Sequence, residues 1–437
     1  MKNYIFIVLV FFVFNLSAQT SAVLRTQLPV IEAPQGPNPY QYQYQPSYQH
    51  QQQTDPYNPN EVTNINRRNE NVINEALAYQ RRMDAETQRQ SDIKMLISQG
   101  FPSESGQKGT SYFYQAFDEI NSMLQGKQPL NLGRSVFLIE NAYLGNSLNY
   151  TDYQNTIKSK VELCKQKIRE DKLDPNSNIV KNMMLFRLVS DTLKIKVKGA
   201  EKPLTHLPIK YDLEGYDYTT HYGTQFVTYL MKNGIGQCHS MPLYYLVLAE
   251  EMGAKAYLAY SPLHSFVKIQ DEKGTWYNLE LTCGAILSDA HYMNSSYIKA
   301  EAIRNRIYLE PMDKTNIVAQ MMLEMASGYY EKYGYDDFYL KCVNTAQQYL
   351  SNKLNATISK VAYEEQLTMV LAYLLDAKKP EIMKEKSPGA YKHYEQVQAL
   401  YKQIDDLGYE ELPKSVYDTW LKHIAKLKAK EDKRKPF

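Results

Sequence analysis

Three residues that together could perform nucleophilic catalysis stand in one stretch of the chain, Gly234–Thr282. They are Cys238, His264 and Glu280. A thiolate attacks a carbonyl carbon, an imidazole moves the protons, and a carboxylate orients the imidazole. The stretch therefore holds the residue types of a cysteine-dependent acyl-transfer site, in the chain order cysteine, histidine, acid.

The segment that follows Cys238 has the pattern of a helix. Gly236 interrupts the chain before it, and Pro242 falls in the expected first turn, where a missing N–H costs no hydrogen bond. Apolar residues recur at helical spacing over 243–247, and Gly253 fits a C-cap. Cys238 is therefore expected at a helix N-terminus, where free N–H groups and the helix dipole favour a thiolate.

His264 and Glu280 fall on two stretches that alternate as β-strands do. Residues 264–270 and 276–281 each place apolar side chains at every second position, and DEKG between them predicts a hairpin turn. The apolar positions should face the core, so His264 and Glu280 share the opposite face. With the turn centred on Glu272 they lie directly opposite each other, with Cβ atoms about 5 Å apart.

The order of these residues on a helix followed by two strands resembles the transglutaminase-like superfamily, a branch of the papain-like fold. The segments that carry the resemblance, which covers about residues 205–310, are GIGQC, HSFV and WYNLELT. The resemblance implies Cys238 as nucleophile, His264 as general base and Glu280 in the place of the usual aspartate, one methylene longer. It also implies an α+β fold with a papain/transglutaminase-like core, preceded and followed by helical bundles.

Two neighbours of Cys238 are candidates for the oxyanion site or the cleft. The Gln237 amide could donate to an oxyanion, although the backbone N–H of Cys238 is the more direct donor. On a helix His239 points about 100° away from Cys238, so we expect it to make an ordinary polar contact near the cleft. No second close pair of ligands accompanies Cys238, His239 and His264, so the sequence indicates neither a metal site nor a cofactor.

Length and composition limit the classes of protein to which this chain can belong. The chain has 437 residues, enough for two or three domains, with 50 basic and 48 acidic residues. This balance argues against a dedicated nucleic-acid-binding protein. Residues 1–18 have the charged start, short apolar run and small-residue end of a signal peptide, which predicts an exported protein, periplasmic or secreted. We expect no membrane span after signal removal.

The other cysteines have less defined expectations. Cys164 and Cys342 each fall on an apolar helix face and are predicted to be buried core residues. Cys283 follows the strand of Glu280 and has no clear role. Since an exported chain permits disulfides, a bond among these three stays open.

Beyond the signal peptide the chain divides into four segments. Residues 19–100 are rich in Gln, Pro, Tyr and Asn and are predicted to be a largely disordered tether, although 61–99 could also be an extended helix. Residues 101–205 are predicted to be the helical N-terminal part of the core, and 206–312 the transglutaminase-like core. Residues 313–437 are predicted to be a C-terminal helical domain, with one weak resemblance to a tetratricopeptide helix pair.

Two functions follow from these observations, and both stay open at this point. The first is an exported cysteine-dependent enzyme that acts on amide or peptide bonds of a protein or peptide substrate through a thioester. Water as acceptor would make it a peptidase or amidase, and an amine would make it transglutaminase-like. The second is a catalytically silent module that keeps this fold and binds a protein partner through its C-terminal helices. The reactivity of the Cys238 thiol distinguishes them.

Overall fold

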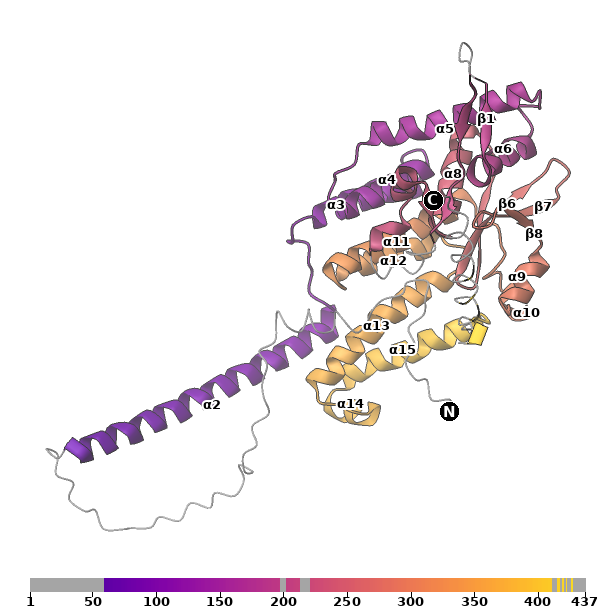
Figure 1. The fold of residues 1–437 in the computed structure, drawn as a ribbon. Coiled ribbons are helices and arrows are strands. Elements are labelled where there is room, and N and C mark those ends of the chain that lie inside the picture. Colours follow the sequence, from indigo (N-terminus) through magenta and orange to yellow (C-terminus); the bar gives the residue numbers. More distant parts are fainter. Residues whose placement is uncertain are drawn as a thin grey trace.

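The computed structural model describes residues 59–196, 202–212 and 221–410, together with residues 415, 416, 419, 422 and 426. The predicted signal peptide and the tether up to residue 58 lie outside the described residues, as does most of the predicted C-terminal helical domain after residue 410. The described chain is a mixed α+β structure in which small sheets lie among many helices (Figure 1).

The part of the described chain before the first strand is helical. Side chains of Asn131, Asn149 and Ser177 cap three of its helices by accepting a backbone N–H from the first turn. Four of these helices lie within 101–205, the segment predicted to be the helical N-terminal part of the core. The elements are α2 (Pro59–Gln99), α3 (Thr110–Leu124), α4 (Leu132–Tyr143), α5 (Tyr150–Glu170) and α6 (Asn178–Ser190).

Helix α2 occupies the part of the predicted tether, 61–99, for which the sequence left an extended helix open as an alternative to disorder. Residues 59–99 form one continuous helix that projects away from the body of the molecule (Figure 1). Its buried residues, Ile93 and Leu96, lie near its C-terminal end, where it packs against two C-terminal helices. The polar composition that suggested disorder also suits an exposed helix, because side chains four residues apart can support one another.

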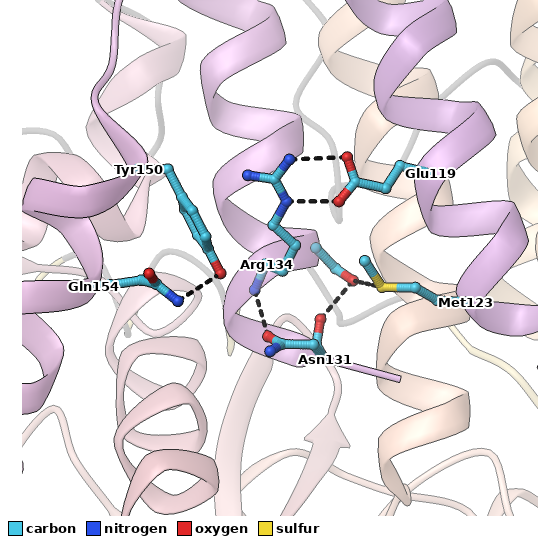
Figure 2. A network of polar contacts seen from close by, with 7 residues as sticks. Glu119, Met123, Asn131, Arg134, Tyr150 and Gln154 are labelled. Atoms are coloured by element: carbon cyan, nitrogen blue, oxygen red, sulfur yellow. Dashed lines mark hydrogen bonds and ion pairs between the residues drawn. The ribbon is translucent and has the colours of Figure 1, made fainter. Parts of the chain in front are cut away.

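Arg134 at the start of α4 ties α3, α4 and α5 together. Its guanidinium donates to both carboxylate oxygens of Glu119 on α3, at 2.6 and 2.8 Å (Figure 2). It also lies over the ring of Tyr150 on α5, 4.4 Å from the ring centre. A two-point pair of this kind fixes an orientation as well as a distance, so it sets the mutual angle of these helices.

The middle of the chain holds the strands and the central helix. The main sheet is antiparallel with the order β5-β6-β7-β8, while β1 pairs with β2 and β3 runs parallel to β4. The elements are β1 (Leu193–Ile195), β2 (Leu204–His206), β3 (Lys210–Tyr211), η1 (Tyr222–Gln225), α7 (Val227–Asn233), β4 (Ile235–Gly236), α8 (Ser240–Met252), β5 (Tyr257–Ser261), β6 (His264–Gln270), β7 (Trp276–Glu280), β8 (Ala285–Leu287), α9 (Asp289–Ser295) and α10 (Ala300–Arg304).

Helix α8 is the central helix of the fold. Every residue over 240–249 is buried, and α8 contacts α4, α5, α6 and α7 on its helical side and β5 and β6 on its sheet side. A helix that is apolar all round must be enclosed on all sides. The predicted cap is present, since Gly253 ends the helix in the left-handed conformation with φ 68°.

Two buried or half-buried carboxylates cap helices other than their own. Glu250 of α8 accepts the backbone N–H groups of Leu132 and Gly133 at the start of α4, at 3.2 and 3.0 Å. Glu140 of α4 accepts the first two N–H groups of α7, at 2.7 and 2.8 Å. Burial raises the pKa of Glu140 to about 7, although its hydrogen bonds to Thr228 and Val227 favour the charged form. These contacts link α8 to α4 and α4 to α7, which leads into the cysteine segment.

The C-terminal part is helical, as predicted, and packs directly on the N-terminal helices. Helix α11 contacts α3 and α4, so one main apolar core runs through both parts. Its elements are α11 (Lys314–Tyr333), α12 (Asp337–Tyr349), α13 (Leu354–Leu374), α14 (Pro380–Lys386) and α15 (Pro388–Asp406). The short α14 was not predicted from the sequence; Pro380 begins it, where a missing N–H costs nothing. In the part of the chain that the structure describes, no helix combines the length and apolar character needed to cross a membrane.

Candidate active site

Cys238 lies in the turn that directly precedes α8, as the sequence predicted. The backbone N–H of Met241 donates to the carbonyl of Gln237 at 3.0 Å, so the first helical turn already encloses Cys238. Gly236 in β4 is required by close packing, because a Cβ there would lie 2.4 Å from the Leu230 side chain. The Cys238 side chain is half-buried at the positive end of the central helix.

The strands β6 and β7 carry His264 and Glu280 on the predicted face. Val267 and Ile269 of β6 and Leu279 of β7 are fully buried in the main core. The opposite face is also covered, since Phe266 is buried in a second apolar cluster formed with α9, α10 and part of the C-terminal helices. The site therefore lies where β6 begins and β7 ends, at one end of the two inner strands of a sheet that is packed on both sides.

The register of the β6–β7 hairpin corrects the expectation that His264 and Glu280 lie directly opposite each other. Gln270 pairs with Trp276, which centres the turn on Lys273, one residue later than predicted. This shifts the pairing by two residues, so every side chain stays on the predicted face of the sheet. His264 and Glu280 then become diagonal neighbours, which lie about 7–8 Å apart on adjacent strands. The glutamate side chain is long enough to span this offset and reach the imidazole.

Glu280 is buried and holds four hydrogen bonds. Its Oε2 accepts from His264 Nε2 at 2.6 Å and from the Tyr292 hydroxyl at 2.9 Å. Its Oε1 accepts from the backbone N–H and the hydroxyl of Thr282, at 3.1 and 2.6 Å. Burial would raise the pKa of Glu280, but the charge of His264 and the hydrogen bonds from His264 and Thr282 hold that pKa well below its usual range.

Tyr292 reaches Glu280 from helix α9, which an ion pair attaches to the sheet. Lys268, buried in β6, donates to the Asp289 carboxylate at the start of α9 at 2.8 Å. The Tyr292 ring then stacks on Phe266, with 4.1 Å between ring centres, and lies 6.3 Å from the His264 ring. The ring position and the hydroxyl hydrogen bond together fix the carboxylate and the imidazole against each other.

His264 connects the carboxylate to the cysteine. Its Nε2 is hydrogen-bonded to Glu280, so Nδ1 is the ring nitrogen that remains available to a thiol. Burial would lower the pKa of His264, but the Glu280 charge, the hydrogen bond to Glu280 and the nearby Cys238 raise that pKa well above its usual value. The Ser265 hydroxyl donates to the Cys238 carbonyl and joins β6 to the backbone of the cysteine turn.

The two neighbours of Cys238 make structural contacts. His239 Nε2 lies 3.1 Å from Glu324 Oε2 on α11, which is the kind of polar contact that the sequence predicted for it. Burial would lower the pKa of His239, but the charge of Glu324 and the hydrogen bond to it raise that pKa. Gln237 is fully buried, and its amide donates to the Thr224 hydroxyl at 3.3 Å. That contact ties Gln237 to η1, so the backbone N–H of Cys238 stays the more direct oxyanion donor.

The other three cysteines lie in different surroundings. Cys164 and Cys342 are fully buried, as predicted, and Cys283 is exposed; all four thiols of the chain are free. Burial raises the pKa of Cys164 to about 12 and raises the pKa of Cys342 and Cys283 as well. Cys238 differs from these three in that it contributes to the raised pKa of two imidazoles, His239 and His264.

Sequence reasoning did not assign Thr282, Tyr292, Ser265 or Glu324 to the site. Thr282 stands two residues after Glu280, and its position in WYNLELT was the available signal. No local pattern marks Tyr292 or Glu324, because their helices reach the site only through tertiary packing.

Comparison with known proteins gives no relative. No protein-family model, no curated protein and no solved structure matches the chain.

Proposed function

We propose that this protein is an exported cysteine-dependent acyl-transfer enzyme that acts on amide or peptide bonds through a thioester. The observation that carries the proposal is the convergence of Cys238, His264 and Glu280. Imidazole and carboxylate are hydrogen-bonded at 2.6 Å, the residue after His264 bonds the Cys238 carbonyl, and Cys238 is close enough to the imidazole to raise its pKa. Nucleophile, base and orienting group occur together in the order that this chemistry requires.

The first half of the reaction forms the thioester. The sulfur of the Cys238 thiolate attacks the carbonyl carbon of the substrate, and the negative charge moves to the carbonyl oxygen. The backbone N–H of Cys238, at the start of α8, is the proposed donor to that oxygen. The C–N bond then breaks while His264 gives its proton to the leaving amine, which leaves an acyl group on the sulfur.

The second half of the reaction releases the acyl group. His264, now neutral, takes a proton from water or from an amine as that acceptor attacks the thioester carbon. The C–S bond breaks and returns the thiolate, and His264 is again protonated beside it. His264 is protonated before the thioester forms and again after the acyl group is released. Glu280 stabilises the imidazolium in both states, because its carboxylate is ionised and held by Thr282 and Tyr292.

The finer description of the fold is part of the same proposal. The cysteine at the start of a central helix, followed by an antiparallel hairpin with the histidine and the acid, supports a papain/transglutaminase-like core over about residues 206–312. The expected substrate is a protein or peptide, and the expected location is outside the cytoplasm.

Incubation of the protein with a peptide library tests the proposal. Mass spectrometry would detect cleaved peptides, or amine-linked peptides when a primary amine is added, and an acyl adduct on Cys238. The Cys238→Ala variant is the control for activity, and Cys283→Ala is the matched control for loss of an accessible thiol elsewhere. No product and no adduct, with Cys238 no more reactive than Cys283 toward iodoacetamide, would refute the enzyme and favour the silent binding module.

A further inference from the structure

The projecting part of helix α2 exposes apolar side chains that the body of the molecule does not cover. Every residue over 62–84 is exposed. Several large apolar side chains in this part are between 41% and 64% exposed. They are Val62, Ile65, Val72, Ile73, Leu77, Tyr79 and Met83. A long helix with this surface is expected to pack against a partner. Helices in proteins gain most of their stability from packing of an apolar face, and an isolated helix is only marginally stable in water.

Most of these residues lie on one narrow seam with alternating steps of three and four. This is the spacing of the a and d positions of a coiled coil, where two helices pack along a repeat of seven residues. The seam is apolar except at Asn69. Its members are Val62, Ile65, Asn69, Val72, Ala76, Tyr79 and Met83.

The charges that flank the seam indicate the direction of the partner. On one side, seven residues apart, stand Glu61, Arg68, Glu75 and Arg82. The other side has no charge at the corresponding positions, which are Asn66, Ile73, Gln80 and Thr87. In a parallel pair of identical helices the charged side of one would face the uncharged side of the other. In an antiparallel pair the charged sides face each other.

The four flanking charges alternate between acidic and basic along the helix, and this alternation selects one antiparallel register. When Val62 packs against Tyr79 of a second copy, Ile65 meets Ala76 of that copy and each large side chain faces a smaller one. In this register Glu61 lies beside Arg82 of the second copy, and Arg68 lies beside Glu75 of the second copy. A slip of seven residues in either direction brings like charges together at the centre of the contact, which is destabilising.

We propose that two copies of the chain form a dimer through an antiparallel coiled coil of their α2 helices, over residues 59–82. The two-fold axis lies between Glu70 and Asn71, so the same surface serves both copies and the assembly is closed. Among the described residues, α2 is fastened to the body beyond this span, where Arg89 Nη1 donates to the Leu374 carbonyl at 3.1 Å. The two bodies would therefore lie at opposite ends of the paired helices. This dimer is independent of the proposed acyl-transfer activity.

Sedimentation and light scattering of the purified protein test the dimer. The expected mass is twice that of the 50.7 kDa chain, less any cleaved signal peptide. The variant Glu61→Arg/Glu75→Arg makes all four flanking positions basic, and Arg68→Glu/Arg82→Glu makes them all acidic. Each is expected to weaken the dimer at least tenfold by itself. An equal mixture of the two should restore a dimer that contains one copy of each.

Matched controls change the same charges on the outer face of α2. Glu70→Arg/Asp84→Arg and Arg67→Glu/Arg81→Glu should leave the dimer unchanged, and circular dichroism of every variant reports whether the fold is intact. A monomer for the unaltered protein at micromolar concentration would overturn the proposal. A dimer that does not respond to the flanking charges would also overturn it, because a parallel pair or another surface would then account for the association.

Cross-linking gives an independent reading of the register. In a Cys238→Ala/Cys283→Ala background, which removes the two accessible native thiols, a mixture of Arg68→Cys and Glu75→Cys proteins should form a disulfide-linked dimer on mild oxidation. Neither protein alone should do so, since equal positions lie apart in the antiparallel arrangement. Efficient cross-linking of Arg68→Cys with itself would contradict the register.

Discussion

Two histidine–glutamate pairs lie near Cys238, and they differ in the contacts that hold them in place. In the first, His264 and Glu280 come from neighbouring strands of one hairpin and are 2.6 Å apart. In the second, His239 comes from the cysteine turn and Glu324 from helix α11, and they are 3.1 Å apart. Both imidazoles have a raised pKa, and the charge of Cys238 contributes to each.

The difference lies in the geometry of each pair, since the residue types are the same. Glu280 is held by Thr282 and Tyr292 in addition to His264, and the strand that carries His264 is bonded to the cysteine turn through the Ser265 hydroxyl and the Cys238 carbonyl. His239 is the N-cap residue of α8, so its side chain leaves the turn in a different direction from that of Cys238 and meets α11. The first pair is suited to proton transfer, and the second attaches the cysteine turn to the C-terminal helices.

The largest expected effect separates the two imidazoles directly. Removal of the imidazolium in His264→Ala should slow alkylation of Cys238 by iodoacetamide at about pH 6 by tenfold or more, because the thiolate loses its counter-charge. Peptide mass spectrometry of the folded protein over time measures the rate at each cysteine. Cys164 and Cys342 should stay unlabelled in both proteins, since burial raises the pKa of each thiol. An unchanged rate at Cys238 would remove His264 from the mechanism.

The second effect concerns Glu280 and is both kinetic and structural. In Glu280→Gln the imidazole keeps its place but loses the charge that raises its pKa, so labelling of Cys238 should slow about threefold to fivefold at pH 6. The free energy of unfolding should fall by roughly 3 kcal/mol, because one partner of a buried ion pair is lost. Urea unfolding measures the second quantity.

The pH dependence of that loss has a definite sign. The folded pKa of Glu280 lies below its ordinary 4.5 and that of His264 above its ordinary 6.5. The pair therefore contributes fully between these ordinary values, less as the pH falls toward the folded pKa of Glu280, and less as it rises toward that of His264. The stability difference between the unaltered protein and Glu280→Gln should be largest near pH 5.5. A difference that grows steadily up to pH 9 would contradict this account.

Sequence reasoning could place the members of the first pair but not their register or their supports. The alternation of apolar residues fixes the faces of β6 and β7, and a slip of two residues leaves those faces unchanged. The centre of the turn is set by Asp271, whose carboxylate accepts the N–H groups of Lys273 and Thr275 at 2.9 and 2.8 Å. A four-residue turn signal does not specify which of its residues is central.

The remaining parts of the site depend on long-range packing. Tyr292 is positioned by the Lys268–Asp289 ion pair, which links two elements with no shared sequence pattern. For helix α2 the composition of the sequence was not enough, because a disordered tether and an exposed helix are equally polar and both lack a wide apolar stripe. The feature that indicates a helix is the narrow seam of apolar residues at steps of three and four.

A smaller effect tests the support of the carboxylate. Tyr292→Phe keeps the ring stacked on Phe266 but removes the hydroxyl that donates to Glu280 at 2.9 Å. The expected loss is about 1 kcal/mol of stability and at most a twofold slowing of Cys238 labelling. Tyr308→Phe is a matched control, since it removes another buried tyrosine hydroxyl away from Glu280. Equal effects of the two substitutions on labelling would mean that Tyr292 acts on packing alone.

The smallest expected effect on the cysteine belongs to the second pair, and it completes the comparison. His239→Gln removes the charge opposite Glu324 while it keeps a polar side chain next to Cys238. Labelling of Cys238 at pH 6 should change less than twofold, because His239 contributes to the field at the sulfur without a hydrogen bond to it. Stability should fall by about 1 kcal/mol, since the contact between the cysteine turn and α11 weakens while the partner carboxylate stays half-buried. If His239→Gln instead slowed labelling as much as His264→Ala, the roles of the two imidazoles would be reversed. The carboxylate that orients the base would then be Glu324 on α11, and the C-terminal helices would be part of the catalytic apparatus.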